Sequence, residues 1–321
     1  MTESAPKRVL LTGATGTIGR AVLTQLIADG HTVVCYGRSR GPANDQVSWR
    51  IGSFADPKTT SERGIEGEQF DAVISCLASR TGTPSDAWAV DHRAQSALLK
   101  AAQQASVPQF ILLSAICVQK PRLAFQHAKL AFENELMASG LNWTIVRPTA
   151  YFKSLSGQVA RVKAGKPYLM FGDGRLTACK PISDRDLAAF IVRCLADTDK
   201  AHRILPIGGP GPALTPRDMG EHIAARLGRP LKFSTMPVAA MRLLAGTMGV
   251  VGTVIPPLRS KAALARIGLY YGTESMLVWD DENGRYDAGA TPEFGADTLF
   301  EHFDQLLSGT AQPERGDHAV F

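Results

Sequence analysis

Three glycines stand three residues apart near the start of the chain, at Gly13, Gly16 and Gly19. The apolar run 9–11 before them is typical of a strand buried on both faces, and the apolar residues of 22–27 recur at helical spacing. Glycine lets the backbone turn tightly and approach a phosphate, whose charge is favoured by the free N–H groups and the dipole at a helix start. The combination therefore predicts a site for the diphosphate of a nucleotide.

A basic cluster follows the next predicted strand, residues 32–36. Sites that prefer NAD usually carry an acidic residue here, which holds the ribose hydroxyls. A guanidinium instead grips a phosphate through two parallel hydrogen bonds. The cluster therefore predicts NADP(H), with Arg38 on the 2′-phosphate, and the alternative is a solvated arginine just past a strand. The cofactor contacts predicted in these two turns are Gly13, Thr15, Gly16, Thr17, Ile18, Gly19, Arg38, Ser39 and Arg40.

The GxxGxxG spacing resembles that of the short-chain dehydrogenase/reductase superfamily, whose members normally carry a serine after the fifth strand and a tyrosine and lysine four residues apart on the next helix. Here Ser114 follows the predicted strand 109–113 and Lys129 is kept, but the tyrosine position is Phe125. A phenyl ring cannot exchange a proton with an alcohol or ketone oxygen. Two interpretations remain: an enzyme that acts on another kind of bond, or a protein that binds the nucleotide without turning it over. Ser114 is equally well explained as a polar cap on the strand end.

These residues are positioned by strands and helices that alternate regularly, which predicts an α/β fold with a doubly wound parallel sheet of the Rossmann type. Besides the two strands above, strands are expected at 47–51, 70–77, 109–113 and 143–146, and helices at 86–105 and 125–137. A small polar turn, 78–82, follows the fourth strand at the carboxyl edge, where open α/β sheets bind ligands. Ala78 and Ser79 are therefore predicted to contact the cofactor, together with Pro148 at the end of the sixth strand.

The regular pattern loosens after Pro148, where a loop-rich segment is expected up to residue 180. A helix at 184–196 and a strand at 204–207 are then expected to return the chain to the sheet. We therefore predict a NADP-binding domain, residues 1–148 with 180–208 returning to it, and a smaller substrate-binding region, residues 149–179 and 209–321.

The segment 243–258 is apolar and uncharged, but glycines and two prolines interrupt it. It is too short and too broken to span a membrane. We predict a flap over an apolar ligand, and the alternatives are a packed helix or shallow contact with a membrane surface.

The composition is that of an ordinary soluble protein with ample core: 321 residues, 45% hydrophobic and 20% charged. The net charge of +5 suits anionic ligands, while the scattered basic residues resemble no nucleic-acid motif. Five cysteines form no close pair, which predicts a reducing compartment, no disulfide framework and no protein metal site. Because the first strand follows the N-terminus directly, we expect no targeting peptide and a cytoplasmic location.

Long runs in both halves of the chain are similar to those of divinyl chlorophyllide 8-vinyl reductases. The runs are 76–82, 112–121, 146–150, 152–155, 170–174, 178–183, 205–211 and 274–278. The resemblance implies an NADPH-dependent enzyme of chlorophyll or bacteriochlorophyll synthesis that reduces the 8-vinyl group of a divinyl chlorophyllide, or its protochlorophyllide precursor, to ethyl. It also accounts for Phe125, because a carbon–carbon double bond presents no oxygen for a tyrosine to protonate. Tyr151 stands where the family pattern predicts phenylalanine, which argues against a general role as proton donor.

The resemblance also implies the remaining site residues. Catalytic roles fall to Lys129, Ser114 and Phe125, with Lys129 also on the nicotinamide ribose and either Lys129 or water as proton donor. A flat macrocycle that carries its own magnesium and a propionate needs apolar walls and a few fixed cations. The substrate contacts predicted on this basis are Arg80, Tyr151, Phe152, Lys153, Tyr168, Phe171 and Lys180. The alternatives are a non-catalytic NADP(H)-sensing or assembly protein, and a reductase of another conjugated alkene.

Overall fold

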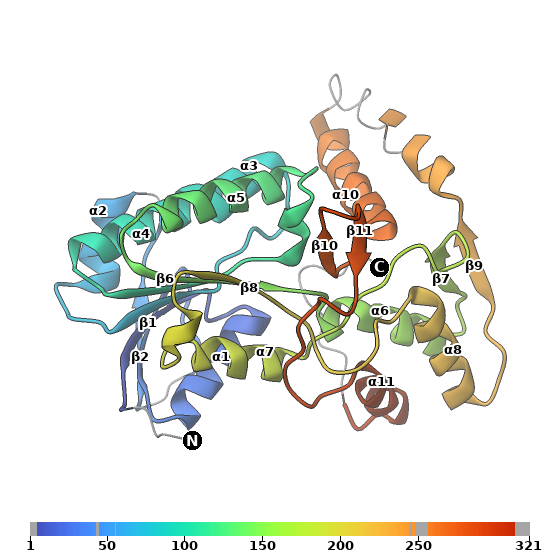
Figure 1. The fold of residues 1–321 in the computed structure, drawn as a ribbon, viewed down its shortest axis with the longest axis horizontal. Coiled ribbons are helices and arrows are strands. Elements are labelled where there is room, and N and C mark those ends of the chain that lie inside the picture. Colours follow the sequence, from blue (N-terminus) through green and yellow to red (C-terminus); the bar gives the residue numbers. More distant parts are fainter. Residues whose placement is uncertain (1–4, 43–44, 55, 244–245, 248–255, 312–321) are drawn as a thin grey trace.

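Seven parallel strands form the central sheet within the part of the chain that the structure describes, residues 5–42, 45–54, 56–243, 246–247 and 256–311. In this computed structural model their order is β3-β2-β1-β4-β5-β6-β8. Figure 1 labels β1, β2, β6 and β8 of the sheet. The strands are β1 (Arg8–Thr12), β2 (Thr32–Gly37), β3 (Val47–Ile51), β4 (Ala72–Ser75), β5 (Gln109–Leu113), β6 (Asn142–Pro148) and β8 (Arg203–Ile207). Val9, Leu10 and Leu11 are fully buried, as a strand covered on both faces requires. The predicted doubly wound parallel sheet is confirmed.

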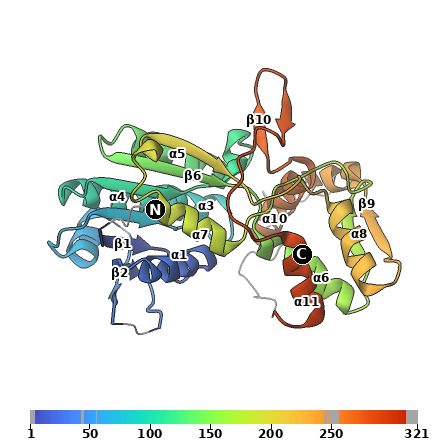
Figure 2. The same ribbon diagram turned by 60° about the horizontal axis from the view of Figure 1, so that its bottom comes forward.

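Helices cover both faces of this sheet (Figures 1 and 2). On one face, α1 (Thr17–Ala28) and α7 (Asp184–Arg193) pack against each other. The helices of the other face are α2 (Pro57–Thr60), the π-helix η1 (Ser61–Ile65), α3 (Pro84–Ala87), the π-helix η2 (Trp88–Ala94), α4 (Gln95–Gln104) and α5 (Ala124–Met137). Two short 3₁₀ turns complete this part, η3 (Ile116–Gln119) after β5 and η4 (Thr198–Lys200) before β8.

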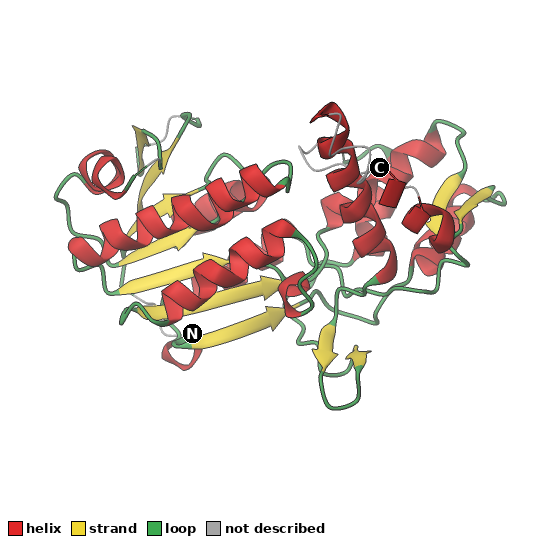
Figure 3. Ribbon diagram, turned by 90° about the horizontal axis from the view of Figure 1, so that it is seen from above, coloured by secondary structure: helices red, strands yellow, loops and turns green. Residues whose placement is uncertain are grey.

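The strand order reverses between β1 and β4, which lie side by side although β2 and β3 separate them in sequence. At such a reversal the two following connections leave toward opposite faces, so a crevice opens beyond the carboxyl ends of the strands. These ends point toward a second, mainly helical region (Figure 3). Strand β8 pairs in parallel with β6, with Ile204 opposite Ile145.

The second region encloses a hydrophobic cluster of its own, which includes Phe152, Tyr168, Tyr270 and Phe303. Its elements are α6 (Phe152–Lys163), β7 (Tyr168–Phe171), α8 (Pro216–Leu227), β9 (Phe233–Met236), α10 (Pro256–Thr273), β10 (Val278–Asp280), β11 (Arg285–Asp287) and α11 (Leu299–Ser308). Strand β7 pairs in parallel with β9, and β10 forms an antiparallel hairpin with β11. The predicted flap, 243–258, falls for most of its length outside the described residues. Among the described helices, none has the length and apolar character needed to cross a bilayer.

The prediction of a loop-rich segment over 149–180 was wrong, because this segment contains α6 and β7. The apolar side chains of α6 do recur at helical spacing, at Phe152, Leu155, Val159 and Val162. The serines and the glycine between them, and the β-branched side chains of Val159 and Val162 themselves, lower the intrinsic helix propensity. The packing of α6 against α11 and the second cluster outweighs that propensity.

The predicted helix 86–105 is helical from Pro84 to Gln104, but seven of these residues, Trp88–Ala94, form the π-helix η2. A π-helical turn widens the helix and often marks a functional position. Here it carries Asp91, whose side chain is buried.

Candidate functional site

A cavity of about 1320 Å³ lies at the carboxyl ends of the strands, between the glycine turn and the start of α6. It exceeds the roughly 300–1,000 Å³ of an ordinary small-molecule site, so it has room for a nucleotide together with a second ligand. Among the described residues that line it, four are basic and one is acidic: Arg20, Arg38, Arg80, Lys153 and Asp184. Basic side chains thus outnumber acidic ones among the described lining residues.

The glycine turn forms one wall of the cavity. Gly13 has a φ of +75°, and a Cβ there would lie 2.4 Å from the carbonyl oxygen of Cys76. A Cβ on Gly19 would lie 2.0 Å from the carbonyl oxygen of Gly13, so both positions require glycine. Gly16 is the N-cap of α1 and offers no side-chain cap, and the first turn of α1 has no acidic residue. The N–H groups at this helix start are therefore available to an anion, which fits the diphosphate of a dinucleotide.

Arg38 and Ser39 line the cavity where β2 ends, whereas the exposed Arg40 does not. Two aromatic residues, Tyr36 and Phe54, also line this end of the cavity. Tyr36 packs edge-on against Phe54, with ring centroids 4.8 Å apart, and its hydroxyl donates to the carbonyl oxygen of Ser53 at 2.6 Å. This end of the cavity thus combines an aromatic wall with a guanidinium, which suits an adenine ring and a phosphate.

Ser114, the predicted catalytic serine, is buried and does not line the cavity. Its hydroxyl donates to Glu133 of α5 at 2.5 Å, and Glu133 is fully buried and also pairs with Arg147. Arg147 reaches Glu133 through Nε at 3.2 Å as well. The hydroxyl therefore joins β5 to α5, in agreement with the alternative of a polar group at the strand end.

Lys129, also predicted as catalytic, forms a buried ion pair with Asp91, with 3.0 Å between Nζ and Oδ1. The same oxygen accepts the backbone N–H of Ser79 at 3.2 Å, while Oδ2 has no hydrogen-bond partner among the described residues. Lys129, Asp91 and Ser79 do not line the cavity, but Ala78 and Val90 next to them do. The pair thus supports the cavity wall from behind. Asp91 carried no sequence signal, because its partner lies on another helix.

Phe125 and Pro148 also lie outside the lining of the cavity. Phe125 stands at the junction with the second region: a Cβ on Gly82 would meet Ile267 of α10 at 3.0 Å and Phe125 at 3.5 Å. Pro148 is buried in β6 and is paired with Ile207. These two residues shape the surroundings of the site and do not form its wall.

The start of α6 brings three predicted substrate contacts, Tyr151, Phe152 and Lys153, into the cavity, and Arg80 enters from the loop after β4. Lys153 Nζ donates to the hydroxyl of Thr17 at 2.6 Å, so it lies at the glycine turn. Burial raises the pKa of the Tyr151 phenol, which therefore stays protonated at neutral pH.

The sequence matches the NAD(P)H-binding family over residues 13–198, more than half of the chain. A divinyl chlorophyllide a 8-vinyl-reductase, chloroplastic, of Cucumis sativus is 44% identical over 332 residues, which cover 98% of this chain and 79% of that protein. This chain belongs to the divinyl chlorophyllide a 8-vinyl-reductase family.

The chain is also similar, more distantly, to proteins outside the vinyl-reductase family. The photosystem II assembly factor Ycf39 of Synechocystis sp. is 27% identical over 74% of this chain and 73% of that protein. The crystal structure of UDP-glucose 4-epimerase from Thermotoga maritima superimposes with a TM-score of 0.62 at 19% identity, covering 72% of this chain and 85% of that one. The latter likeness shows the fold alone.

Three predicted substrate contacts of this vinyl-reductase family member lie away from the cavity. Tyr168 is buried in the second cluster and packs edge-on against Phe233. Phe171 lies beside Gly272 of α10. Lys180 is buried and pairs with Glu293, so its charge is used within the protein.

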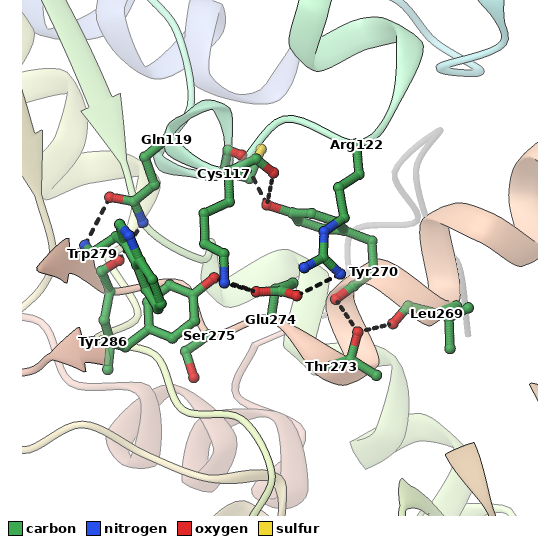
Figure 4. A network of polar contacts seen from close by, with 12 residues as sticks. Cys117, Gln119, Arg122, Leu269, Tyr270, Thr273, Glu274, Ser275, Trp279 and Tyr286 are labelled. Atoms are coloured by element: carbon green, nitrogen blue, oxygen red, sulfur yellow. Dashed lines mark hydrogen bonds and ion pairs between the residues drawn. The ribbon is translucent and has the colours of Figure 1, made fainter. Parts of the chain in front are cut away.

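A polar network ties the loop after β5 to the second region of this vinyl-reductase family member (Figure 4). Glu274 at the end of α10 is nearly buried and pairs with Lys120 at 3.0 Å and Arg122 at 2.8 Å. Tyr286 of β11 donates to it at 2.6 Å, and the ammonium of Lys120 lies 3.8 Å from the ring centre of Trp279. Burial opposes ionisation of Glu274, but this hydrogen bond and the two cations outweigh it and lower the pKa of the carboxyl.

The described residues contain no group of three or more His, Cys, Asp and Glu side chains arranged to hold a metal ion. Cys35, Cys117, Cys179 and Cys194 are buried free thiols, and Cys76 is a free thiol at the cavity wall.

Proposed function

We propose that this protein reduces the 8-vinyl group of a divinyl chlorophyllide to ethyl, in chlorophyll or bacteriochlorophyll synthesis, with NADPH as reductant. The observation that carries the proposal is the 44% identity over 98% of the chain to a divinyl chlorophyllide a 8-vinyl-reductase. The size of the cavity supports it, because about 1320 Å³ suits a nucleotide and a second ligand in one space.

The preference for NADPH over NADH rests on Arg38. Its side chain lines the cavity at the end of β2, next to Ser39. A guanidinium binds the 2′-phosphate of NADPH through paired charge-assisted hydrogen bonds, whereas NADH offers only a hydroxyl at this position. We therefore assign the 2′-phosphate to Arg38.

The residues around the site suit reduction of a carbon–carbon double bond. Bound NADPH supplies a hydride, so that conversion of a vinyl to an ethyl group needs one further proton. Phe125 stands where a carbonyl reductase has its tyrosine, and an alkene has no oxygen that such a tyrosine would protonate. Lys129 is held by Asp91 behind the wall, so we propose a positioning role for Lys129 and water as the proton source.

The substrate macrocycle needs apolar walls and a cation for its propionate. Leu77, Val90 and Phe152 supply apolar lining, and Arg80 supplies a guanidinium in the same cavity. Holding the vinyl group close to the nicotinamide accounts for much of the acceleration, since alignment contributes up to roughly 7–11 kcal/mol in well-oriented systems.

A second candidate function, assembly or nucleotide sensing without turnover, is favoured by the 27% identity to a photosystem II assembly factor.

The cytoplasmic location also stays a prediction, and the name of the Cucumis sativus relative places that protein in the chloroplast.

An absorption time course separates these functions. Purified protein is mixed with divinyl chlorophyllide a and NADPH, with NADH in a parallel cuvette. Loss of one conjugated vinyl group shifts the Soret band to shorter wavelength, and we expect this shift with NADPH. Tight binding of NADPH without any shift would instead support the non-catalytic function or another alkene substrate.

A further inference from the structure

Lys153 comes from the first turn of α6, yet its ammonium reaches the first residue of α1. The distance from Nζ to the hydroxyl oxygen of Thr17 is 2.6 Å, and both residues line the same cavity. We propose that Lys153 is a ligand of the nucleotide diphosphate, supplied across the cavity by the second region. This inference rests on the proposed function, in which the cavity binds NADPH. It adds to the nucleotide site a residue that lies outside the glycine turn.

The electrostatics of the turn favour this role. The N–H groups of the first turn of α1 are not capped by a side chain at Gly16, and no acidic residue stands in that turn. A diphosphate placed there carries two negative charges, and a helix start offers roughly half a positive charge. An ammonium beside Thr17 adds a full positive charge at the same place, through charge-assisted hydrogen bonds.

The position of Lys153 differs from the one expected for the predicted partner of the substrate carboxylate. Its contact with Thr17 places the ammonium at the turn whose glycines are fixed by backbone packing. Arg80 also enters the cavity, from the loop after β4, and we assign the substrate carboxylate to it. The two cations thus serve two different anions.

A consequence concerns how the second region and the nucleotide communicate. Lys153 is part of α6, whose Phe152 belongs to the second hydrophobic cluster. A diphosphate held between α1 and Lys153 therefore couples nucleotide binding to the position of α6, along which Ser156 and Gly157 also line the cavity.

The test is a titration of the purified full-length protein without pigment, followed by nucleotide fluorescence. The variants are Lys153→Met, Lys153→Arg and, as matched control, Lys166→Met, which removes a charge from an exposed lysine outside the cavity. We expect Lys153→Met to raise the Kd for NADPH roughly 10- to 100-fold, the range for a hydrogen bond to a charged group. Lys153→Arg should retain most of the affinity, and Lys166→Met all of it.

Two further ligands locate the effect. Adenosine 2′-monophosphate keeps the 2′-phosphate but lacks both phosphates of the diphosphate, so its Kd should change much less in Lys153→Met than the Kd for NADPH. Chlorophyllide affinity, measured by pigment absorbance without nucleotide, should stay at the wild-type value. A normal Kd for NADPH in folded Lys153→Met, or a loss confined to chlorophyllide, would overturn the proposal.

The outcome is independent of turnover. If Lys153→Met binds NADPH more weakly than the wild type, but the wild type does not reduce the pigment, the proposed function fails and the role of Lys153 stands. If reduction proceeds and Lys153→Met binds NADPH normally, only the role of Lys153 fails. A circular-dichroism spectrum of each variant establishes that it is folded, and Lys153→Gln provides a second neutral variant.

Discussion

The ammonium of Lys129 and the carboxylate of Asp91 form an ion pair of 3.0 Å, in which the Asp91 side chain is fully buried and that of Lys129 is 11% exposed. The pair joins α5 to the π-helix η2, directly behind the residues of η2 that line the cavity. Buried ions are costly unless paired, so each partner depends on the other.

Lys129→Met should lower the free energy of unfolding by about 3–5 kcal/mol, because it leaves a buried carboxylate without its cation. The double variant Lys129→Met/Asp91→Asn removes both charges and should regain much of that loss. Urea unfolding of the wild type, both single variants and the double variant gives the coupling energy.

Vinyl reduction should be lost in Lys129→Met while pigment binding persists. Additive single-variant effects would contradict the pairing, and normal turnover in Lys129→Met would exclude the positioning role of Lys129.

Arg38→Asp should raise the KM for NADPH by roughly 10- to 100-fold and leave that for NADH nearly unchanged, because a hydrogen bond to a charged group contributes about 1.5–3 kcal/mol. Arg40→Asp is the matched control, since it makes the same change two residues away at an exposed position that does not line the cavity. Steady-state kinetics with both nucleotides provides the comparison. Equal effects of Arg38→Asp on the two KM values would refute the 2′-phosphate contact.

Tyr151→Phe should retain turnover to within about tenfold. The phenol lines the cavity, and burial raises its pKa further above neutral pH, but family resemblance predicts phenylalanine at this position. A general acid contributes typically 10²–10⁴-fold to a rate. The measurement is the rate of reduction in single-turnover experiments with saturating NADPH. A loss of rate of that size would identify Tyr151 as the proton donor in place of water.

Glu274 should make stability depend on pH. Its folded-state pKa lies below the ordinary value of 4.5, so the unfolded chain binds the proton more readily. The stabilising contribution is therefore complete above pH 4.5 and is lost as the pH falls below it toward the folded-state pKa. Urea midpoints on both sides of this pH should show the loss in the wild type.

Glu274→Gln should be less stable at neutral pH by about 1.5–3 kcal/mol, the range for hydrogen bonds to a charged group. It should also show a weaker decline in stability below pH 4.5 than the wild type does. Glu282→Gln, at an exposed position between β10 and β11, removes the same charge and should behave like the wild type. Identical pH profiles for wild type and Glu274→Gln would exclude the carboxyl as their source.

The sheet was predictable because its signals are local. The apolar run of β1, the glycines after it and the alternation of strands and helices specify the fold within short windows, and the return of the chain at β8 agrees with the strand predicted at 204–207. Arg38 could be placed in the same way, since its position follows from the end of a strand. Helix α6 was missed because tertiary packing outweighs its weak propensity.

Side-chain pairings over long sequence separations had no such signal. Ser114 is bonded to Glu133, and Lys180 to Glu293, through contacts that exist only once the helices and loops have packed. Because Ser114 follows a predicted strand, the sequence predicted that it lies near the site. The sequence could not show in which direction its hydroxyl points. The same holds for Lys153, whose partner Thr17 lies 136 residues away in sequence.

The packing of α6 against α11 has a consequence for synthesis on the ribosome. The strands of the sheet are complete once Ile207 has emerged, whereas α11 spans Leu299–Ser308. Domains generally begin to fold as they emerge, from the N-terminal side. The nascent chain can therefore assemble its nucleotide-binding sheet well before α6 gains its final neighbour, so the wall that carries Lys153 is set among the last steps of folding.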